Sequence, residues 1–359
     1  MALSLDAYAV QLAGKNKLSL KLKERALLRT ALYQHLYMSR IPLFAIVNET
    51  VEIAKMRCHT TTAAFFNHLL RKMQDVPLSL PQGATPHAIS LRTSYPEYFV
   101  QLLLKQYPVE KVIEILETGN KPPQVTLRVR PQADQGFYQE PAFSWISEAP
   151  PVVRLNETQR LTEIALRKDA YIQNWTPAYL MDRLCNASSQ APTAILDLCA
   201  APGGKLLAVH DHFPKAKLFA NDVSAEKMAQ IEENCAKYGI EATLSCQRGE
   251  EFSSADKFDL IILDAPCSNT GVLNKRAEAR WRLNKESVEA HAALQKKLLK
   301  HAASLLKSGG ELWYLTCSIL PEENQEVARS LGLSLHSETL ILPTPDGKDG
   351  GYAVCLKAG

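Results

Sequence analysis

The sequence has no closely paired cysteines, no long apolar run and no recognisable export signal. Its eight cysteines are scattered, and no two of them form a C-x-x-C pair. This spacing argues against a structural zinc site, and the length of the chain argues against a disulfide framework. The longest aliphatic runs, such as residues 260–263, are far too short to cross a bilayer, and the N-terminus lacks the basic and apolar succession of a signal peptide. We therefore expect a cytoplasmic protein with reduced thiols, no bound metal and no contact with a membrane.

The composition is typical of a folded protein with more than one domain. The chain has 359 residues, of which 46% are hydrophobic and 22% are charged, and domains usually hold about 100–200 residues. The net charge is only +3, but residues 1–75 carry 11 Lys and Arg against 5 Asp and Glu, whereas residues 191–359 carry 19 against 22. A basic block beside an acidic region favours a polyanionic partner, and an ordinary solvated helix surface explains it equally well.

Hydrophobic periodicity divides the chain into three regions. Apolar residues recur at three- and four-residue spacing over 18–73, so residues 1–75 are predicted to form a small all-α domain. Residues 76–190 are predicted to form a linker rich in Pro, Gly, Ser and Thr, followed by a small α+β domain. In residues 191–359, short aliphatic strands alternate with helical patterns, which predicts a doubly wound α/β domain with a parallel sheet. The strands expected in this last region are 194–198, 217–221, 242–246, 259–264 and 311–317, and the helices are 204–212, 224–238 and 286–306.

The loop after the first of these strands is the best candidate for a cofactor site. It reads LDLCAAPGGK, and its Gly203 and Gly204 would let a ligand approach the backbone at a helix N-terminus. Asp222 follows the second strand, where an acid commonly holds ribose hydroxyls, and Glu250 follows the third, where it would hold the edge of a base. The chain lacks G-x-G-x-x-G and the phosphate loop G-x-x-x-x-G-K-[ST]. This favours a nucleoside cofactor without pyrophosphate, of which S-adenosylmethionine is the common one; glycines that serve only a tight turn are the alternative.

Two cysteines and an acid follow the fourth and fifth predicted strands. Asp264 and Cys267 lie in DAPCSNTGVL, and Cys317 lies in TCSILPEEN. If the two strands pair, their ends lie about 5 Å apart and both thiols can face one cavity. A thiolate that adds to carbon 6 of a pyrimidine activates carbon 5 toward a methyl donor, and an acid near ring nitrogen 3 promotes that addition. Asp264 is placed for the acid, the spacing does not rank the two thiols, and packed structural cysteines are the alternative.

Together these motifs resemble those of the RNA cytosine-C5 methyltransferase family, and the likeness extends over most of the chain. The segments that match its cofactor and catalytic motifs are DLCAAPGGK, DAPCSNTGVL followed by ARWR, and TCSILPEEN. The N-terminal segments AIVNETVEIAK and FFNHLLR are similar to the NusB-type RNA-binding domain of its bacterial small-subunit rRNA branch, often called Sun or RsmB. The resemblance implies a class I S-adenosylmethionine-dependent methyltransferase with a Rossmann-like doubly wound sheet, preceded by an all-α NusB-like domain and a small α+β domain.

The resemblance also implies roles for individual residues. Cys317 would be the nucleophile, Cys267 would assist release of the methylated product, and Asp264 would line both the cofactor pocket and the base pocket. The residues expected to bind S-adenosylmethionine are Cys199, Ala200, Ala201, Pro202, Gly203, Gly204, Lys205, Asp222, Glu250 and Asp264. The chain departs from the family at Glu250, where Asp is usual, and at Asn269, where a small residue is common. Its helical domain is also expected to lack the usual first helix or two.

Basic and aromatic residues after the second motif are the candidates for RNA contact. They are Lys275, Arg276, Arg280, Trp281 and Arg282. Basic side chains bind phosphate and an aromatic ring stacks on an unstacked base, and a solvated helix start explains the segment equally well. We expect a monomer that transfers a methyl group from S-adenosylmethionine to carbon 5 of a cytidine in 16S rRNA through a covalent Cys–C6 adduct. The alternatives are the same chemistry on tRNA or another RNA, and a non-catalytic RNA-binding or ribosome-assembly factor.

Overall fold

The computed structural model describes residues 1–188 and 190–357, and the chain divides into two compact units, Met1–Asn120 and Lys121–Gly359. The finer division at residues 75 and 190 stays a prediction. Among the described residues, no helix combines the length and the apolar character that crossing a bilayer would need.

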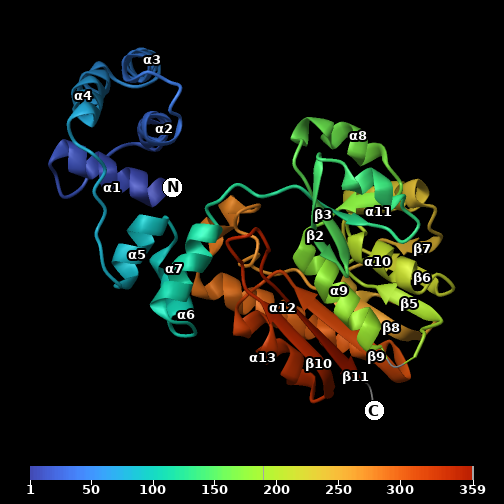
Figure 1. Cartoon of the computed structure of the whole chain (residues 1–359). Helices are drawn as coiled ribbons and strands as arrows, with labels where there is room; N and C mark the ends of the chain where they lie inside the picture. Colours follow the sequence, from blue (N-terminus) through green and yellow to red (C-terminus); the bar gives the residue numbers. More distant parts are fainter. Residues whose placement is uncertain (189, 358–359) are drawn as a thin grey trace. The chain divides into compact units, whose positions relative to one another are not determined.

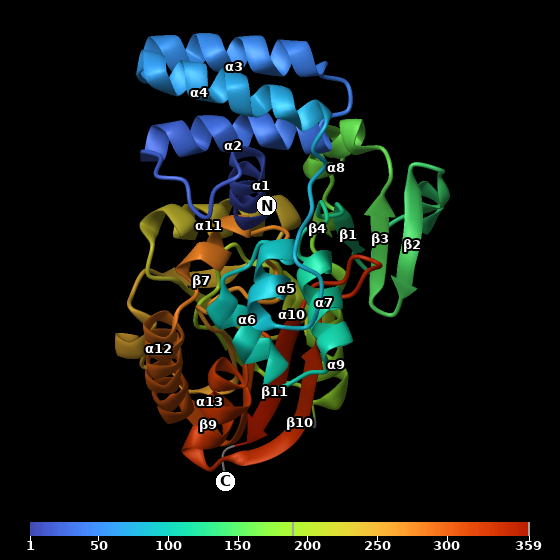
Figure 2. The same cartoon turned by 90° about the vertical axis from the view of Figure 1, so that its left-hand side faces the viewer.

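The first unit is helical throughout. Its helices are α1 (Ala2–Ala13), α2 (Leu22–Tyr37), α3 (Leu43–Arg57), α4 (Thr60–Arg71), α5 (Pro86–Thr93), α6 (Glu97–Leu104) and α7 (Val109–Thr118). Figure 2 shows α2, α3 and α4 running side by side, and a core that includes Tyr8, Leu32 and Phe66 joins them to α1. Our predicted helical pattern began only at residue 18. Helix α1 precedes it because Leu5, Tyr8 and Leu12 recur at a spacing that buries one face.

The second unit begins with a four-stranded antiparallel sheet in the order β2-β3-β1-β4. The elements are β1 (Thr126–Val129), β2 (Phe143–Glu148), β3 (Pro151–Leu155), α8 (Leu161–Leu166), β4 (Ala170–Ile172) and α9 (Trp175–Ala187). Leu127, Tyr138 and Val153 lie in its core. The alternating pattern that predicted a strand near residue 125 therefore corresponds to β1, the inner strand between β3 and β4.

The second sheet of this unit has seven strands in the order β10-β11-β9-β8-β5-β6-β7. The strands are β5 (Ala194–Asp197), β6 (Lys217–Asn221), β7 (Ala242–Ser245), β8 (Phe258–Asp264), β9 (Leu306–Thr316), β10 (Ser334–Ile341) and β11 (Gly351–Lys357), and the helices are α10 (Gly204–His212), α11 (Ala225–Tyr238), α12 (Lys285–Ser304) and α13 (Gln325–Ala328). One core packs α9, α10 and α11 on one face, and another packs α12 and α13 on the opposite face (Figure 1). The predicted doubly wound α/β architecture is confirmed.

The five predicted strands form the parallel part of the sheet, and two further strands make the sheet as a whole mixed. Strands β5 to β9 pair in parallel, whereas β11 is antiparallel to both β9 and β10. A short connection joins β10 to β11, and only antiparallel neighbours can be joined without a long crossover. The order reverses between β5 and β8, and ligands of doubly wound sheets bind at such a point, beyond the carboxyl ends of the strands.

A buried ion pair fastens the small sheet to the large one. Arg130, directly after β1, places its Nη2 atom 2.7 Å from Oδ1 of Asp211 in α10, and both side chains are 5% exposed. The guanidinium also donates to the carbonyl oxygens of Lys168 and Tyr238 and lies over the Tyr238 ring. These contacts hold the two sheets of the second unit in a fixed relation.

Candidate active site

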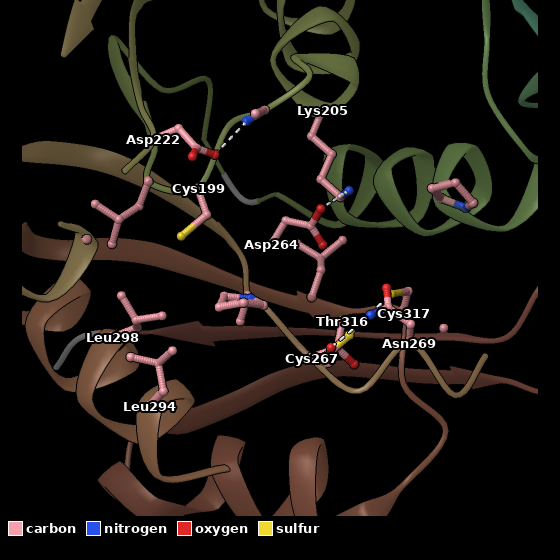
Figure 3. A pocket seen from close by; sticks show the side chains of 18 of the residues that line it. Cys199, Lys205, Asp222, Asp264, Cys267, Asn269, Leu294, Leu298, Thr316 and Cys317 are labelled. Atoms are coloured by element: carbon pink, nitrogen blue, oxygen red, sulfur yellow. Dashed lines mark hydrogen bonds and ion pairs between the residues drawn. The ribbon is translucent and has the colours of Figure 1, made fainter. Parts of the chain in front are cut away.

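A cavity of about 610 Å³ lies at the carboxyl ends of the central parallel strands, where the strand order reverses between β5 and β8. Leu198 follows β5, Asp222 follows β6, and Asp264 and Thr316 end β8 and β9; all four line the cavity. Figure 3 shows that acidic, basic and sulfur-bearing side chains from these separate strands point into one space. The cavity therefore collects groups that are far apart in the sequence.

Asp222 is the acid at one end of this cavity, and it is held in place by backbone amides. Its Oδ2 atom accepts a hydrogen bond from the amide of Ala201 at 3.3 Å, and its Oδ1 atom accepts one from the amide of Ser224 at 3.2 Å. The side chain is only 5% exposed yet lines the cavity. A carboxylate fixed in this way suits a pair of ribose hydroxyls.

The predicted cofactor-binding residues divide into two groups. Those that line the cavity are Cys199, Ala201, Lys205, Asp222, Glu250 and Asp264. The others build the turn that leads from β5 into α10 and do not line the cavity; they are Ala200, Pro202, Gly203 and Gly204. Gly203 has φ +102, a conformation that favours glycine, and it caps the N-terminus of α10. The turn glycines therefore shape the site, and the neighbouring side chains would meet the ligand.

Glu250 and two leucines enclose the same end of the cavity. The backbone amide of Glu250 and the ion pair with Arg248 hold the pKa of the Glu250 carboxyl below its usual range, so this carboxylate is charged at neutral pH. Leu294 and Leu298, both from α12, line the same cavity and form an apolar part of its wall (Figure 3). An acid for the ribose, an acid for the base edge and an apolar wall for the rings fit the nucleoside part of S-adenosylmethionine.

Lys205 and Asp264 form an ion pair in the middle of the cavity. Their Nζ and Oδ2 atoms are in contact, and Figure 3 shows the two side chains pointing toward each other. Burial is the largest single influence on the pKa of Lys205 and lowers it, but the charge of Asp264, its hydrogen bond and the charges of Asp197 and Cys317 together raise that pKa above its usual value. Lys205 therefore stays charged and fixes the direction of the Asp264 carboxyl.

The two predicted thiols face each other. The Sγ atoms of Cys267 and Cys317 are 3.1 Å apart, and both residues line the cavity with Asp264. Their hydrogen bond is the largest cause that raises the pKa of Cys267 well above its usual value, and burial adds to it. Cys267, which is 7% exposed, thus keeps its proton, while Cys317 is more open to the cavity.

Asn269, where the sequence departs from the family, forms hydrogen bonds with both cysteines. Its Oδ1 atom accepts a hydrogen bond from Cys317 Sγ at 3.2 Å, and its Nδ2 atom donates one to the carbonyl oxygen of Cys267 at 3.0 Å. The residue has φ +61, a left-handed conformation that Asn tolerates better than most side chains. Nothing in the local sequence pattern marks it for this role.

The loop after Cys267 is packed closely against the β10–β11 connection. The amide of Gly271 donates to the carbonyl oxygen of Cys317 at 2.8 Å, and the amide of Gly350 donates to the carbonyl oxygen of Gly271 at 2.7 Å. A Cβ atom on Gly271 would lie 2.6 Å from the Gly350 backbone, so a side chain has no room there. Asp349 and Gly350 from this connection and Gly351, the first residue of β11, complete the cavity wall together with Thr176 and Pro177 of α9.

The candidate RNA-binding residues have different surroundings. Lys275 pairs with the buried Asp349, with Nζ 2.6 Å from Oδ2. Arg280 is 4% exposed and donates to the carbonyl oxygen of Leu273, so it holds the loop rather than facing solvent. Arg276 and Arg282 are exposed, and Trp281 is 47% exposed. Of the five candidates only Arg280 is buried, and Lys275 is exposed like Arg276, Trp281 and Arg282.

Comparisons with known proteins match the N-terminal and the C-terminal parts of the chain to two families. The family described as 16S rRNA methyltransferase RsmB/F matches residues 186–353, and the NusB family matches residues 2–75. The chain is 32% identical over 333 residues to the ribosomal RNA small subunit methyltransferase B of Escherichia coli O127:H6, which covers 89% of this chain and 76% of that protein. It is 30% identical over 368 residues to the protein of the same name from Pasteurella multocida, with 92% and 79% covered.

A solved structure shares the fold. A methyltransferase homolog protein from Pyrococcus horikoshii matches with a TM-score of 0.66 at 21% identity, over 77% of this chain and 100% of that one. The resemblance drawn from the motifs, the fold class and S-adenosylmethionine as the cofactor are thereby confirmed. The chain belongs to the RsmB/F family of small-subunit rRNA methyltransferases, which use S-adenosylmethionine.

Proposed function

We propose that this protein methylates carbon 5 of a cytidine in 16S rRNA through a covalent bond between Cys317 and carbon 6. The observation that carries the proposal is the pair of thiols 3.1 Å apart in a cavity that also holds Asp264 and Asp222. A methyltransferase that acts on an exocyclic nitrogen or a ribose oxygen has no need for a thiol pair. The proposal includes action as a monomer in the cytoplasm.

The chemistry assigned to each residue follows from its surroundings. S-adenosylmethionine supplies the methyl group, which it carries on a positively charged sulfur. Cys317 adds as a thiolate to carbon 6, and the proton that its thiol gives up passes to ring nitrogen 3, where Asp264, oriented by Lys205, accepts its hydrogen bond until the proton leaves again when the adduct breaks down. Carbon 5 then takes the methyl group, a base removes the proton from carbon 5, and the carbon 6–sulfur bond breaks. The sum is one C–H bond replaced by one C–CH₃ bond, with one proton released.

Cys317 is the better nucleophile of the two because Cys267 holds its proton. The hydrogen bond between Cys267 and Cys317 and the burial of Cys267 both keep the Cys267 pKa high. The protonated thiol of Cys267, in contact with Cys317, is placed to give a proton to the departing sulfur at release. This division of roles agrees with the one that the family resemblance implies.

Direct product analysis tests the proposal. Purified protein, labelled S-adenosylmethionine and 16S rRNA should yield label in 5-methylcytidine after digestion to nucleosides, and bisulfite sequencing of rRNA from a deletion strain should show the loss of one protected cytidine. Label in another nucleoside would overturn the carbon-5 assignment. Label in tRNA but not in 16S rRNA would overturn the substrate.

Replacing Cys267 with alanine is expected to trap the enzyme on its substrate. Without a proton donor for the departing sulfur, the methylated adduct with Cys317 should accumulate as a slowly migrating protein–RNA band in a denaturing gel. Cys246→Ala is the control, because Cys246 is exposed and does not line the cavity. A trapped band in Cys317→Ala instead would reverse the two roles.

Replacing Asp222 with asparagine is expected to weaken cofactor binding. A hydrogen bond to a charged group contributes about 1.5–3 kcal/mol, so the dissociation constant of S-adenosylmethionine should rise by about 10- to 100-fold. Isothermal titration calorimetry measures this directly, with the exposed Asp256→Asn as the control. Unchanged affinity in the Asp222 variant would remove this residue from the cofactor site.

A further inference from the structure

Cys267 and Cys317 are each followed by a serine, and both serines bind the same carboxyl group. The backbone amide of Ser268 donates to Oε1 of Glu323 at 2.8 Å, and the Ser268 hydroxyl donates to Oε2. The Ser318 hydroxyl donates to the same Oε2 atom at 2.5 Å. One side chain therefore connects the loop that carries Cys267 with the loop that carries Cys317.

Glu323 is itself held from several directions. It ends the short helix Pro321–Glu323 and is 0% exposed. Gln295 of α12 donates to its Oε1 atom at 3.3 Å and to the carbonyl oxygen of Pro266 at 2.9 Å, and the Tyr314 hydroxyl donates to its backbone oxygen at 2.5 Å. Burying a carboxyl group costs free energy unless hydrogen bonds satisfy its oxygen atoms. The donors around Glu323 supply these hydrogen bonds.

Glu323 does not line the cavity and contacts neither sulfur in the structure. Its effect on the thiols passes through Ser268 and Ser318, the immediate chain neighbours of the two cysteines. Shifting either loop would change the distance between the sulfur atoms, now 3.1 Å. Reaction rates are sensitive to displacements of this kind, and an error of 1 Å can cost about 100-fold.

We infer that Glu323 is a positioning residue, whose carboxyl group ties the two cysteine loops together and sets both thiols at their working distance. The inference rests on the proposed function, in which both thiols act on one pyrimidine ring. It also assigns a role to the serine that follows each cysteine.

The charge of Glu323 has a second effect. After the hydrogen bond with Cys317, burial and the charge of Cys317, the negative charge of Glu323 is a further cause that raises the pKa of Cys267. Removing this charge should lower that pKa and let Cys267 ionise more readily. A structural role alone does not predict this change.

Glu323→Gln, which keeps the shape and removes the charge, tests the inference. We expect kcat for methyl transfer to fall by about 100-fold, with the affinity for S-adenosylmethionine unchanged. We also expect iodoacetamide, followed by peptide mass spectrometry, to alkylate Cys267 at a lower pH than in the wild type. The exposed Glu326→Gln, in the next turn of the chain, is the matched control and should behave as the wild type. Wild-type kcat and an unchanged Cys267 alkylation profile in Glu323→Gln would overturn the inference.

Ser318→Ala covers the case in which Glu323→Gln does not fold, as judged by loss of S-adenosylmethionine binding. It removes a single hydrogen bond to the carboxyl, and kcat should fall by about 10-fold; full activity would overturn the inference. The wild-type protein separates this outcome from failure of the proposed function. If the wild type makes no 5-methylcytidine, the proposed function fails, and the pH profile of Cys267 alkylation, which needs no methyl transfer, still decides the role of Glu323.

Discussion

Cys317→Ala is expected to abolish methyl transfer to RNA. In the proposed mechanism carbon 5 of the pyrimidine is not activated without the thiolate, and Cys267 cannot take over because burial and the charge of Glu323 still raise its pKa after the Cys317 thiol is removed. Loss of the nucleophile from a covalent mechanism costs on the order of 10⁴- to 10⁶-fold in rate. The measurement is transfer of label from S-adenosylmethionine to 16S rRNA under single-turnover conditions.

The control for this variant is Cys58→Ala, since Cys58 lies at the end of α3 in the other unit. The Cys317 variant should still bind S-adenosylmethionine with wild-type affinity, because Asp222 and the α12 leucines are untouched. A rate within 10-fold of the wild type would remove Cys317 as the nucleophile and, with it, the covalent mechanism.

Arg130→Met is expected to lower the free energy of unfolding substantially. In the wild-type structure both side chains of the pair are 5% exposed. The substitution therefore leaves Asp211 charged and buried without its partner. Breaking a buried ion pair by removing one partner costs about 3–5 kcal/mol. The small sheet should lose its connection to α10, and the free energy of unfolding, measured by urea denaturation, should fall by that amount.

Arg329→Met is the matched control for this effect. Arg329 pairs with Glu338 at 3.5 Å on the surface, where its side chain is 65% exposed. An exposed pair contributes about 1 kcal/mol or less. An equal decrease in the free energy of unfolding for the two variants would show that the buried Arg130–Asp211 pair contributes no more to stability than an exposed pair.

Local patterns were sufficient to predict most of the parallel part of the sheet. The expected strand 217–221 and helix 204–212 coincide with β6 and α10, because each has its own periodic pattern and its own turn residues. Strand β10 was missed. It lies at the edge of the sheet, and residues Ser334–Ile341 show no run of buried apolar side chains. Helix α1 was also missed, although Leu5, Tyr8 and Leu12 are spaced as on one helix face.

The candidate site was predictable where one motif carries both the strand end and its reactive residue. Asp222, Asp264 and the two cysteines satisfy this condition, and the structure brings them into one cavity. Leu294 and Leu298 do not, because they lie on a helix whose residues have no spacing that distinguishes a cavity wall from core packing. The basic character of Arg280 predicted an RNA contact, yet the side chain is buried, which composition alone does not reveal.

The close backbone contact between Gly271 and Gly350 means that an active fragment of the chain must include the β10–β11 hairpin. Every motif that carries a reactive group lies before residue 325, so a chain cut after α13 would retain all of them. Such a fragment would lack the hairpin on which the Cys267 loop rests and would leave β9 as an unprotected sheet edge. The final two strands are thus a support that the catalytic machinery cannot lose, although they contribute no reactive group of their own.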